Sequence, residues 1–429
     1  MFLVKNGLVI DPANGINGIR DVLVRDGVII EVSEHIEITP ELEVIDAGEK
    51  IVTPGLIDMH VHLREPGLEA KETIASGTRA AAMGGFTSVA CMPNTKPVID
   101  SLILIEAVNG IARREGLVNV FPIGAITKGS QGGELAEIGD MVQGGAVAIS
   151  DDGKPVGSAE IMRLALEYSK MFGIPVISHC EDTSLAHEGL MHLGAVATVL
   201  GLKGIPAAAE EIMLARDLIL AEATGARLHV AHISTRGSVE LIRNAKQRGV
   251  QVTCEVTPHH LSLTDKAVEG YDTATKVNPP LRPIEHVLAL RQALNAGVID
   301  VIATDHAPHA EEEKAVEFAA APFGLVGLET AVPLVMELVR SGELNLERAV
   351  AALTLQPARI LGLTGGSLTP GKAADLTIID PNLELTLEAS DLESKGKNSP
   401  FLGKKLQGFP VLTMVKGRIV MQDRKLMTE

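Results

Sequence analysis

The sequence predicts an α/β fold in which a (β/α)8 TIM barrel is joined to a small β-sandwich domain built from both termini. Two observations carry this prediction. Through the middle of the chain, eight apolar strand-like segments alternate with helix-like segments, which is the element count of an eight-stranded parallel barrel. At both ends of the chain, short strand-like segments follow one another with only turns between them.

The eight central strand-like segments are rich in Val, Ile and Ala and are apolar along most of their length. Parallel strands that are covered on both faces have this composition. The segments lie near residues 56–62, 86–91, 118–124, 146–151, 174–179, 226–232, 250–256 and 299–305. A doubly wound open sheet is the structural alternative, because periodicity alone does not distinguish it from a closed barrel.

Helix-like segments separate these strands, with apolar residues at three- and four-residue spacing. Examples are Glu69–Met83, Ser158–Phe172, Ala208–Ala223, Thr235–Arg248 and Ile284–Asn295. In a barrel of this type such helices form the outer ring.

The two ends of the chain share a different pattern. Short strand-like runs end at turn signals such as Asp11-Pro12 and Asp26-Gly27, and Gly417 marks a similar tight turn near the C-terminus. We therefore predict one small β domain formed by residues 1–53 and 367–429, and a barrel catalytic domain formed by residues 54–366.

Composition excludes several classes of function. The formal net charge of −17 disfavours nucleic acid and anionic membrane surfaces as partners. A local arginine can still attract a small anionic substrate. No apolar run reaches the roughly 18 residues of a membrane helix, and the first residues do not resemble a signal peptide.

The three cysteines, Cys91, Cys180 and Cys254, follow no zinc-finger or disulfide spacing. We expect them to be reduced buried thiols in a cytoplasmic protein.

Polar residues gather where the apolar strands end. The first strand ends in His60 and His62, which point to the same face because they are two residues apart. Other strands end in an acidic pair or in histidine, and the eighth ends in a further carboxylate. These residues are Asp151, Asp152, His179, His232 and Asp305. In a parallel barrel the C-terminal strand ends meet at one mouth, so we expect a metal site there.

Histidine and carboxylate ligands without thiolate suit zinc or a similar divalent ion. Four imidazoles and two carboxylates exceed what one tetrahedral ion with a bound water needs. They suit two ions roughly 3.5–4 Å apart that share a bridging ligand and a hydroxide. With Asp305 to move the proton, hydrolysis of an amide-like bond follows as the reaction class.

Several other histidines are expected to have ordinary structural roles. His229 precedes His232 by three residues, which places it on the opposite strand face. His192 is expected on the surface, and His306 is expected to form local hydrogen bonds. The pair His259-His260 follows the seventh strand and is a candidate to support the metal ligands.

At these residues the chain resembles the dihydroorotase family, in its bacterial long-chain type, within the amidohydrolase superfamily. The run Asp58-Met-His60-Val-His62-Leu-Arg64-Glu-Pro66 looks like the first family signature. Ala303-Thr-Asp305-His-Ala-Pro-His309, followed by Lys314, looks like the second. Four shorter motifs also match: Met92-Pro-Asn94-Thr, Ser150-Asp-Asp-Gly153, Ser178-His-Cys-Glu181 and Val277-Asn278-Pro-Pro280.

The resemblance implies a barrel of the metal-dependent hydrolase type that holds two Zn²⁺ ions in each subunit. One zinc site would use His60, His62 and Asp305, and the second would use His179 and His232. Asp152 would bridge the two ions together with hydroxide, and Asp151 is the alternative. Related enzymes bridge with a carboxylated lysine, but Ser150-Asp-Asp-Gly153 supplies no lysine, so none is expected.

The implied reaction is the reversible interconversion of N-carbamoyl-L-aspartate and (S)-dihydroorotate plus water, the third step of de novo pyrimidine (UMP) biosynthesis. Asp305 would be the catalytic proton carrier. Substrate contacts in the family fall on these positions: His62, Arg64, Asn94, Asn278, His309, and the backbone at Phe323 and Gly324. A guanidinium such as that of Arg64 can hold the substrate carboxylate bidentately.

Two rival functions remain open at this point. One is another cyclic amidohydrolase, such as a hydantoinase, dihydropyrimidinase or allantoinase. The other is a non-catalytic dihydroorotase-like partner of aspartate transcarbamoylase. From the resemblance we also expect a homodimer and a possible complex of the active enzyme with aspartate transcarbamoylase. Residues 310–323, between His309 and Phe323-Gly324, are the candidate for a mobile loop at the mouth.

Overall fold

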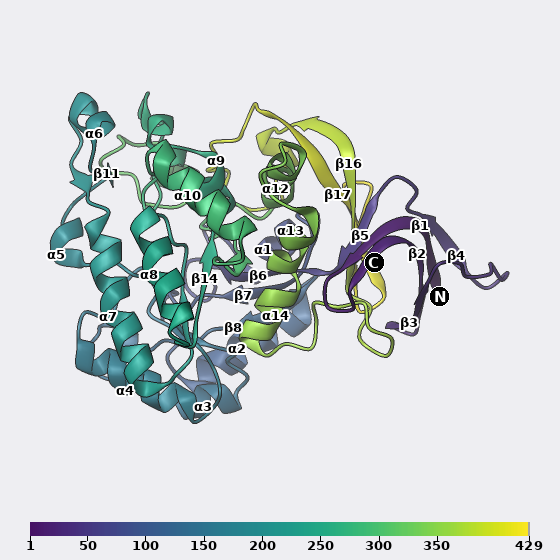
Figure 1. The fold of residues 1–429 in the computed structure, drawn as a ribbon, viewed down its shortest axis with the longest axis horizontal. Helices are drawn as coiled ribbons and strands as arrows, with labels where there is room; N and C mark the ends of the chain where they lie inside the picture. The colour runs from purple at the N-terminus through teal and green to yellow at the C-terminus, as the bar shows by residue number, and fades with distance from the viewer. Residues whose placement is uncertain (428–429) are drawn as a thin grey trace.

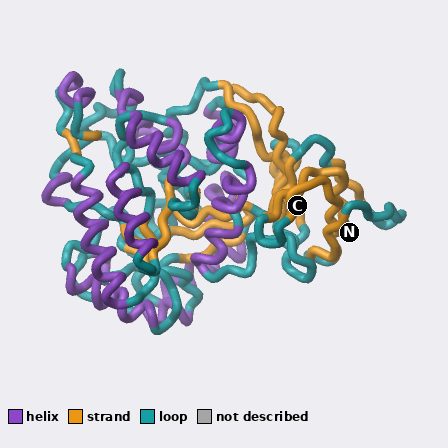
Figure 2. Tube along the Cα trace, viewed as in Figure 1, coloured by secondary structure: helices purple, strands orange, loops and turns teal. Residues whose placement is uncertain are grey.

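The computed structural model describes residues 1–427. A helix-coated body forms one side of the molecule, and a β-sheet region that contains both termini forms the other (Figure 1). Figure 2 shows a core of strands enclosed by helices in the first part and a region made mostly of strands in the second.

Eight parallel strands form the barrel, and each lies inside one of the eight predicted segments. They are β6 (Leu56–Val61), β7 (Phe86–Cys91), β8 (Asn119–Pro122), β9 (Ile149–Ser150), β10 (Val176–Ser178), β13 (Leu228–Val230), β14 (Val252–Val256) and β15 (Val301–Ile302). Several are shorter than predicted, at the N-terminal end as well as at the C-terminal end, where the chain enters the mouth of the barrel.

Isolated bridges close these strands into a ring. β6, β7 and β8 form one parallel sheet, and β9, β10, β13, β14 and β15 form another. Parallel bridges from Gly124 to Ile149 and from Val61 to His306 join the two sheets at both edges. The fold is therefore a closed barrel, and the open-sheet alternative is wrong.

Helices cover the outside of the barrel, as the spacing predicts. The longer ones are α1 (Ile74–Met83), α2 (Leu102–Glu115), α4 (Ala159–Lys170), α7 (Ala208–Thr224), α8 (Arg236–Gln247), α10 (Ile284–Asn295), α12 (Ala331–Arg340), α13 (Leu346–Leu353) and α14 (Leu355–Leu361). α1 starts five residues later than expected because Thr73 caps it, accepting a hydrogen bond from the Ser76 N–H.

Shorter elements lie in the connections between strands and helices. They are α3 (Ile138–Gln143), α5 (Thr183–Ala186), β11 (Met191–His192), α6 (Ala195–Leu200), β12 (Gly204–Ile205), α9 (Pro258–Ser262) and α11 (Glu311–Lys314). α9 and α11 follow the seventh and eighth barrel strands.

Strands from both ends of the chain form one nine-stranded sheet. They are β1 (Phe2–Asp11), β2 (Ile16–Arg25), β3 (Val28–Ser33), β4 (Glu43–Asp46), β5 (Ile51–Pro54), β16 (Leu376–Thr386), β17 (Lys405–Val415), β18 (Arg418–Gln422) and β19 (Lys425–Leu426). β5 joins the halves by pairing with β1 on one side and with β16 on the other. The predicted domain boundaries at residues 53/54 and 366/367 stay a prediction.

The segment between β16 and β17, residues 387–404, leaves this sheet and packs against the barrel. Leu387, Leu392 and Phe401 form a buried cluster with Val326 and Leu334 of the barrel region. This excursion brings C-terminal residues to the mouth of the barrel.

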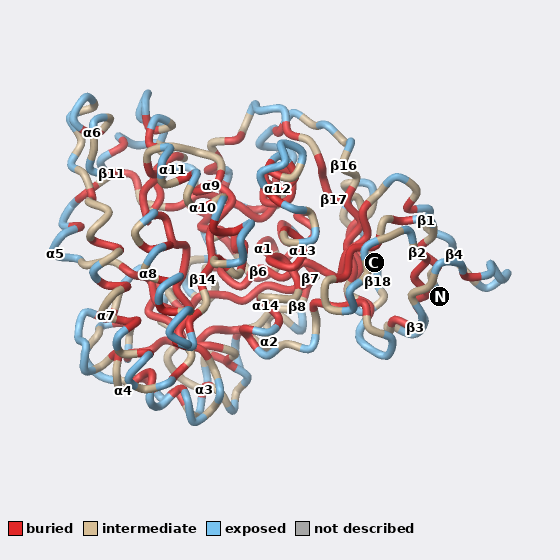
Figure 3. The backbone as a smooth tube through the Cα atoms, in the orientation of Figure 1, coloured by how far each residue is buried: buried red, intermediate tan, exposed pale blue. Residues whose placement is uncertain are grey.

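Burial follows the two-part architecture. The most deeply buried backbone runs through the barrel strands and through the junction with the terminal sheet (Figure 3). Inside the barrel the packing residues are small or slender, including Met59, Ala90, Ala148, Ile177 and Ala303. The three cysteines are buried and free, as predicted. Within residues 1–427 no helix has the length and apolar character needed to cross a membrane.

Candidate metal centre and active site

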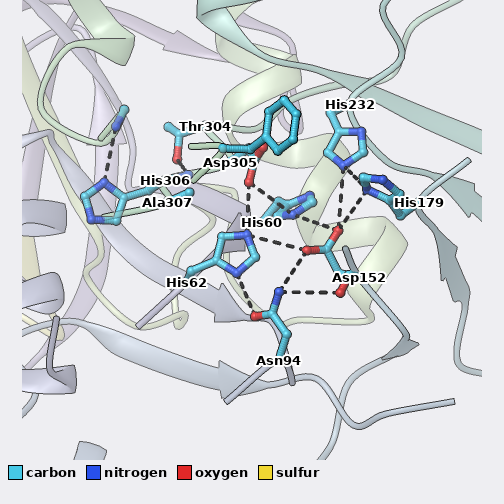
Figure 4. A network of polar contacts seen from close by, with 12 residues as sticks. His60, His62, Asn94, Asp152, His179, His232, Thr304, Asp305, His306 and Ala307 are labelled. Carbon is cyan, nitrogen blue, oxygen red and sulfur yellow. Dashed lines mark hydrogen bonds and ion pairs between the residues drawn. The ribbon is translucent and has the colours of Figure 1, made fainter. Parts of the chain in front are cut away.

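The predicted ligands from five different strands meet at the mouth of the barrel (Figure 4). His60 is on β6, and His62 follows directly after that strand. The Nε2 atoms of His60 and His62 lie 3.5 and 3.0 Å from Oδ1 of Asp305, which follows β15. This trio matches the set that the resemblance assigns to the first metal.

Asp152 occupies the centre of the cluster. Its Oδ1 lies 3.5 Å from His60 Nε2, 3.5 Å from His179 Nδ1 and 3.6 Å from His232 Nε2. Its Oδ2 lies 3.5 Å from His62 Nε2. One carboxylate thus faces the candidate ligands of both sites, which is the arrangement that a bridging ligand requires.

Asp151 points elsewhere. Its Oδ1 accepts hydrogen bonds from the N–H groups of Ile126 and Thr127, at 2.8 and 3.1 Å, and its Oδ2 accepts one from the Thr127 hydroxyl. These contacts anchor the loop after β8. Of the two neighbouring aspartates, only Asp152 faces the histidines.

The cluster fits a divalent cation. His60 Nε2 and Asp152 Oδ1 are buried and have no hydrogen-bond partner among the described residues, so both lone pairs are directed at the shared space. Two overlapping triads have ligand atoms close enough for a single ion: His60, Asp152 and His232, and His60, His62 and Asp305. Imidazole and carboxylate donors are the set that zinc and similar metals bind.

The neighbouring imidazoles favour the ionised form of both carboxylates. Burial opposes ionisation, but the charge of His60 and the contact with His62 outweigh it and lower the pKa of Asp305 to about 2. Burial likewise opposes the ionisation of Asp152, and the adjacent imidazoles hold its pKa well below the ordinary value. The centre therefore presents two negative charges to a cation.

Arg64 lies beside this centre, as the signature predicts. It adopts the left-handed backbone region, with φ of 62°, and its Nε donates to the Pro308 carbonyl at 3.2 Å. Burial lowers the pKa of Arg64, while the negative charges of Asp305 and Asp152 raise it. A guanidinium at this position can balance a substrate carboxylate.

Asn94 contacts the candidate ligands directly. Its Oδ1 lies 2.9 Å from His62 Nδ1, and its Nδ2 donates to Asp152 Oδ2 at 3.3 Å. With Nδ1 of His62 donating to Asn94, Nε2 of that ring is free to face the centre. Asn94, predicted as a substrate contact, therefore also orients two candidate ligands.

Asn278 lines a small cavity next to the second set of ligands. The cavity walls include His179, Pro279 and Arg282. The predicted contact of Asn278 with substrate stays a prediction.

A wall beside Arg64 is formed by two segments that contact each other. Nε2 of His309 lies 2.8 Å from the Phe323 carbonyl, and the Gly324 N–H donates to the Lys276 carbonyl at 2.8 Å. Burial, with the positive charges of Arg64 and Lys71, lowers the pKa of His309 to about 3. The ring is therefore neutral and donates its Nε2 proton to Phe323.

The family comparisons agree with this geometry. The family description "Dihydro-orotase-like" matches residues 49–238, and the description "Amidohydrolase family" matches residues 220–421. A dihydroorotase from Pelotomaculum thermopropionicum is 60% identical over 423 residues, which cover 98% of this chain and 99% of that protein. This chain belongs to the dihydroorotase family. A dihydroorotase from Acetivibrio thermocellus is 53% identical, over 99% of this chain and 100% of that protein.

Solved structures support the same fold. The L-hydantoinase (dihydropyrimidinase) from Arthrobacter aurescens superposes with a TM-score of 0.90 at 30% identity, covering 100% of this chain and 97% of that one. A D-hydantoinase from Thermus sp. gives a TM-score of 0.83 at 26% identity, covering 100% and 97%. The predicted architecture and the predicted metal-dependent hydrolase of the dihydroorotase family are confirmed.

In this dihydroorotase-family chain, one buried carboxylate at the centre was missed by the sequence analysis. Glu255, on β14, places Oε1 2.6 Å from Nδ1 of His60 and Oε2 3.1 Å from Nε2 of His229. It holds the His60 ring with Nε2 towards Asp152. Burial opposes ionisation, but His60 and His229 lower the pKa of Glu255 far below its usual range.

The prediction for His229 is wrong. His232 has a φ of 31°, so the strand ends at Val230 and the two-residue alternation does not continue to His232. Both histidines can therefore lie on the inner side of the barrel, and the ring of His229 is fully buried against Glu255 and Thr253.

The prediction for His192 is also wrong. Its ring is buried, and its Nδ1 accepts a hydrogen bond from Arg282 at 3.0 Å. Arg282 in turn lies 3.5 Å from Glu210. Burial, together with the charge of Arg282, lowers the pKa of His192 to about 4. No sequence motif links these three residues, which come from three distant segments.

The remaining histidines behave largely as expected. His306 contacts Glu72 and accepts the Gly327 N–H at 3.2 Å. His260 contacts the Thr257 hydroxyl and the carbonyl of Pro279, the residue that follows Asn278. Its role in supporting the metal ligands stays a prediction.

Residues 310–323 are tied down at several points. The Lys276 ammonium donates to the carbonyls of Phe318, Ala319 and Ala321, at 2.8, 3.0 and 2.6 Å. An ammonium has three N–H groups, so these contacts satisfy all of them. Lys314 donates to Thr273 and Pro322. A mobile loop over this range stays a prediction, and the contacts describe a closed arrangement.

Proposed function

We propose that this dihydroorotase-family enzyme interconverts N-carbamoyl-L-aspartate and (S)-dihydroorotate plus water, the third step of de novo pyrimidine biosynthesis. The observation that carries the proposal is the position of Arg64 beside a cluster of four imidazoles and two carboxylates. The cluster suits hydrolysis of a cyclic amide, and the guanidinium suits a ring that carries a carboxylate.

We propose that the metal is zinc and that two ions bind. His60, His62 and Asp305 would hold the first, His179 and His232 the second, and Asp152 would face both. Two zinc ions held there would supply a water of lowered pKa and a Lewis acid for the ring carbonyl. No carboxylated lysine is needed, because the Asp152 carboxylate occupies the central position.

Asp305 is proposed as the proton carrier. Its carboxylate is ionised and lies within hydrogen-bond reach of His62. In the hydrolytic direction it accepts the proton of the attacking water and gives it to the ring nitrogen that leaves. In the synthetic direction the same residue removes a proton from the carbamoyl nitrogen and returns it to the departing oxygen.

Substrate orientation is assigned to residues around the mouth. Arg64 would hold the carboxylate bidentately, and the amides of Asn94 and Asn278 would pair with the polar edge of the ring. His309 and the backbone at Phe323-Gly324 would form the wall beside Arg64, as in the family.

The nearest rival is a different cyclic amidohydrolase, because the solved relatives with this fold include hydantoinases. A panel of carbamoyl-aspartate, dihydroorotate, dihydrouracil, hydantoin and allantoin separates the candidates by product formation. Metal analysis of the same sample gives the identity and number of ions. Turnover of dihydrouracil or hydantoin without turnover of dihydroorotate would overturn the proposal.

A non-catalytic role is the rival from a different class. All six residues of the expected ligand set are present and converge, which supports an active enzyme. A protein that stays inactive towards the whole panel after zinc or manganese is supplied would favour the non-catalytic role.

We further propose a cytoplasmic homodimer that can bind aspartate transcarbamoylase. The family resemblance supports the assembly, and the three buried free thiols are compatible with a reducing compartment. Light scattering of the purified protein, alone and mixed with the transcarbamoylase, tests both assemblies.

A further inference from the structure

A segment of the C-terminal region lies against the candidate substrate wall. Residues 393–398 belong to the excursion between β16 and β17, outside the barrel strands. The closest approach is at Gly396, where an added Cβ would lie 2.7 Å from Pro308 Cβ and 3.0 Å from the His309 nitrogen. The excursion therefore touches the loop that carries His309.

Asn398 makes the polar contacts of this segment with the wall. Its side chain is 7% exposed. Oδ1 accepts a hydrogen bond from the His309 N–H at 3.1 Å, while Nδ2 donates to the carbonyls of Ala307 and Gly324 at 3.2 and 3.0 Å. Its own carbonyl accepts the Val326 N–H at 3.0 Å.

These contacts join two segments that are distant from each other along the chain. Ala307 and His309 follow β15, and Figure 4 shows Ala307 next to Asp305 and His306. Gly324 belongs to the next loop, and its φ of 130° is a conformation that only glycine adopts readily. The Asn398 amide thus adds a side-chain link between the two halves of the wall, beside the direct contacts of His309 Nε2 with the Phe323 carbonyl and of the Ala307 N–H with the Leu325 carbonyl.

We propose that Asn398 is a positioning residue for substrate binding, which fixes His309 and Gly324 relative to each other at the barrel mouth. This inference rests on the proposed function, because it assumes that the wall binds dihydroorotate or carbamoyl-aspartate. The residue does not touch the reacting atoms. It acts through the backbone of the two loops.

The chemistry of the position selects an amide. The site needs one acceptor for an N–H and donors for two carbonyls, and asparagine supplies both. An aspartate of the same size keeps the acceptor but turns a second oxygen towards the two carbonyls. Alanine removes all three contacts.

The segment itself is fixed to the barrel by buried carboxylates. Glu72 accepts hydrogen bonds from the Ser394 hydroxyl and the Lys395 N–H, and Glu329 accepts one from the Glu393 N–H at 2.8 Å. These anchors hold the excursion when the Asn398 side chain is changed, so the effect of a substitution stays local.

The test compares N398A and N398D with wild type and with N119A as a matched control. Asn119 also uses its Nδ2 in part-buried hydrogen bonds, with the Thr87 carbonyl and with Asp375, but it lies at the opposite end of the barrel. Steady-state kinetics with dihydroorotate, zinc content and thermal melting are measured for each protein. Hydrogen exchange of residues 305–326 is measured without substrate.

We expect KM to rise at least about tenfold in both Asn398 variants while kcat changes less than about threefold, because the wall binds substrate equally in ground and transition states. Hydrogen exchange should be faster than in wild type at His309 and in residues 324–326. N119A should melt earlier with unchanged KM and unchanged exchange at the wall. If N398A does not fold, the same measurements on N398D test the proposal.

An unchanged KM in the Asn398 variants, or exchange at the wall no faster than in N119A, would overturn the inference. If wild type does not act on dihydroorotate, the proposed function fails, and the positioning role is then judged on hydrogen exchange alone. The two failures are thereby distinguishable.

Discussion

Asp305 has two tasks in the proposed reaction, since it faces a metal and moves a proton. In D305N the acceptor for the proton is lost, and we expect kcat to fall about 10²–10⁴-fold, the range of general acid–base catalysis. The fold should persist, because the polar contacts of the Asp305 side chain within residues 1–427 are with His60 and His62 of the cluster. Turnover, zinc content and circular dichroism are the measurements. D140N on the surface is the control, and near-normal turnover of D305N would contradict the role.

Glu255 should set metal affinity through His60. A carboxylate that accepts the second nitrogen proton of a ligand histidine fixes its orientation and increases its basicity. In E255Q we expect zinc affinity to fall about 10–100-fold, measured by competition with a chelating dye.

The control for this variant is E222Q, which loses only an exposed ion pair with Arg248. Equal zinc affinity of E255Q and wild type would contradict the assignment to Glu255.

Some of these residues could be predicted from sequence, and others could not. His60 and His62 are two apart on one strand, so their common face follows from local geometry alone. Glu255 and His60 are 195 positions apart, and no local rule pairs them. His229 was misplaced because the strand ends before His232, and a left-handed φ in the middle of a motif leaves no mark in the sequence.

At the scale of elements, the loop over residues 310–323 depends on Lys276. In K276M the three carbonyl acceptors lose their donor, and hydrogen bonds to charged groups contribute about 1.5–3 kcal/mol. We expect hydrogen exchange in residues 316–322 to accelerate and the melting temperature to fall by a few degrees. K266M, which removes an exposed lysine, is the control. Unchanged exchange in K276M would show that the loop is held by other contacts.

The contribution of Glu329, which holds the excursion over residues 387–404, to protein stability should depend on pH. Burial raises the pKa of Glu329 to about 8, above the 4.5 of an unfolded glutamate. Between these values the folded state binds more protons than the unfolded state, so the contribution of Glu329 to stability decreases as pH rises. E329Q should be close to wild type at pH 5 and gain at least about 1 kcal/mol relative to it by pH 8.

Denaturant unfolding of both proteins at several pH values measures this difference. A difference that is independent of pH would contradict the raised pKa. E160Q supplies the baseline, because the exposed Glu160 carboxylate has a pKa that its contact with Arg163 lowers, so its stability contribution should change little between pH 6 and pH 8.

Elements with regular periodicity were predicted well. α10 has the predicted ends, and every barrel strand falls within its predicted segment. Helix ends that are set by a side-chain cap were predicted less accurately. The start of α1 at Thr73 is an example, because the cap depends on the direction of one hydroxyl group. The excursion over residues 387–404 could not be located, since the packing of Phe401 and Asn398 on the barrel depends on the tertiary fold.

For the whole molecule, stability should depend on bound metal. A ligand that binds only the folded state stabilises it, by about 2.7 kcal/mol at 100 times Kd. Two ions that join five strand ends should therefore raise the melting temperature of the barrel. We expect chelation to lower it by several degrees and zinc to restore it, measured by calorimetry. A melting temperature that does not respond to chelator would contradict the proposed metal centre.

The overall architecture was accessible from sequence, but its closure was not. Eight alternating units indicate a parallel sheet in either of two topologies. The choice is made by contacts such as Val61 with His306 and by the hydrogen bonds of Asp58 with Thr304, which join the first and last barrel strands. Such pairings between distant segments depend on the assembled chain.

The pairing of β5 with β16 has a consequence for synthesis on the ribosome. The two strands are joined residue by residue, Ile51 with Ile379 and Pro54 with Leu376, although more than 300 positions separate them. As the chain emerges, β5 is exposed early, and its partner appears only after the whole barrel has been translated. The nascent protein must therefore carry an unfinished sheet edge until almost the last codons are read, and an unpaired edge is a site of aggregation.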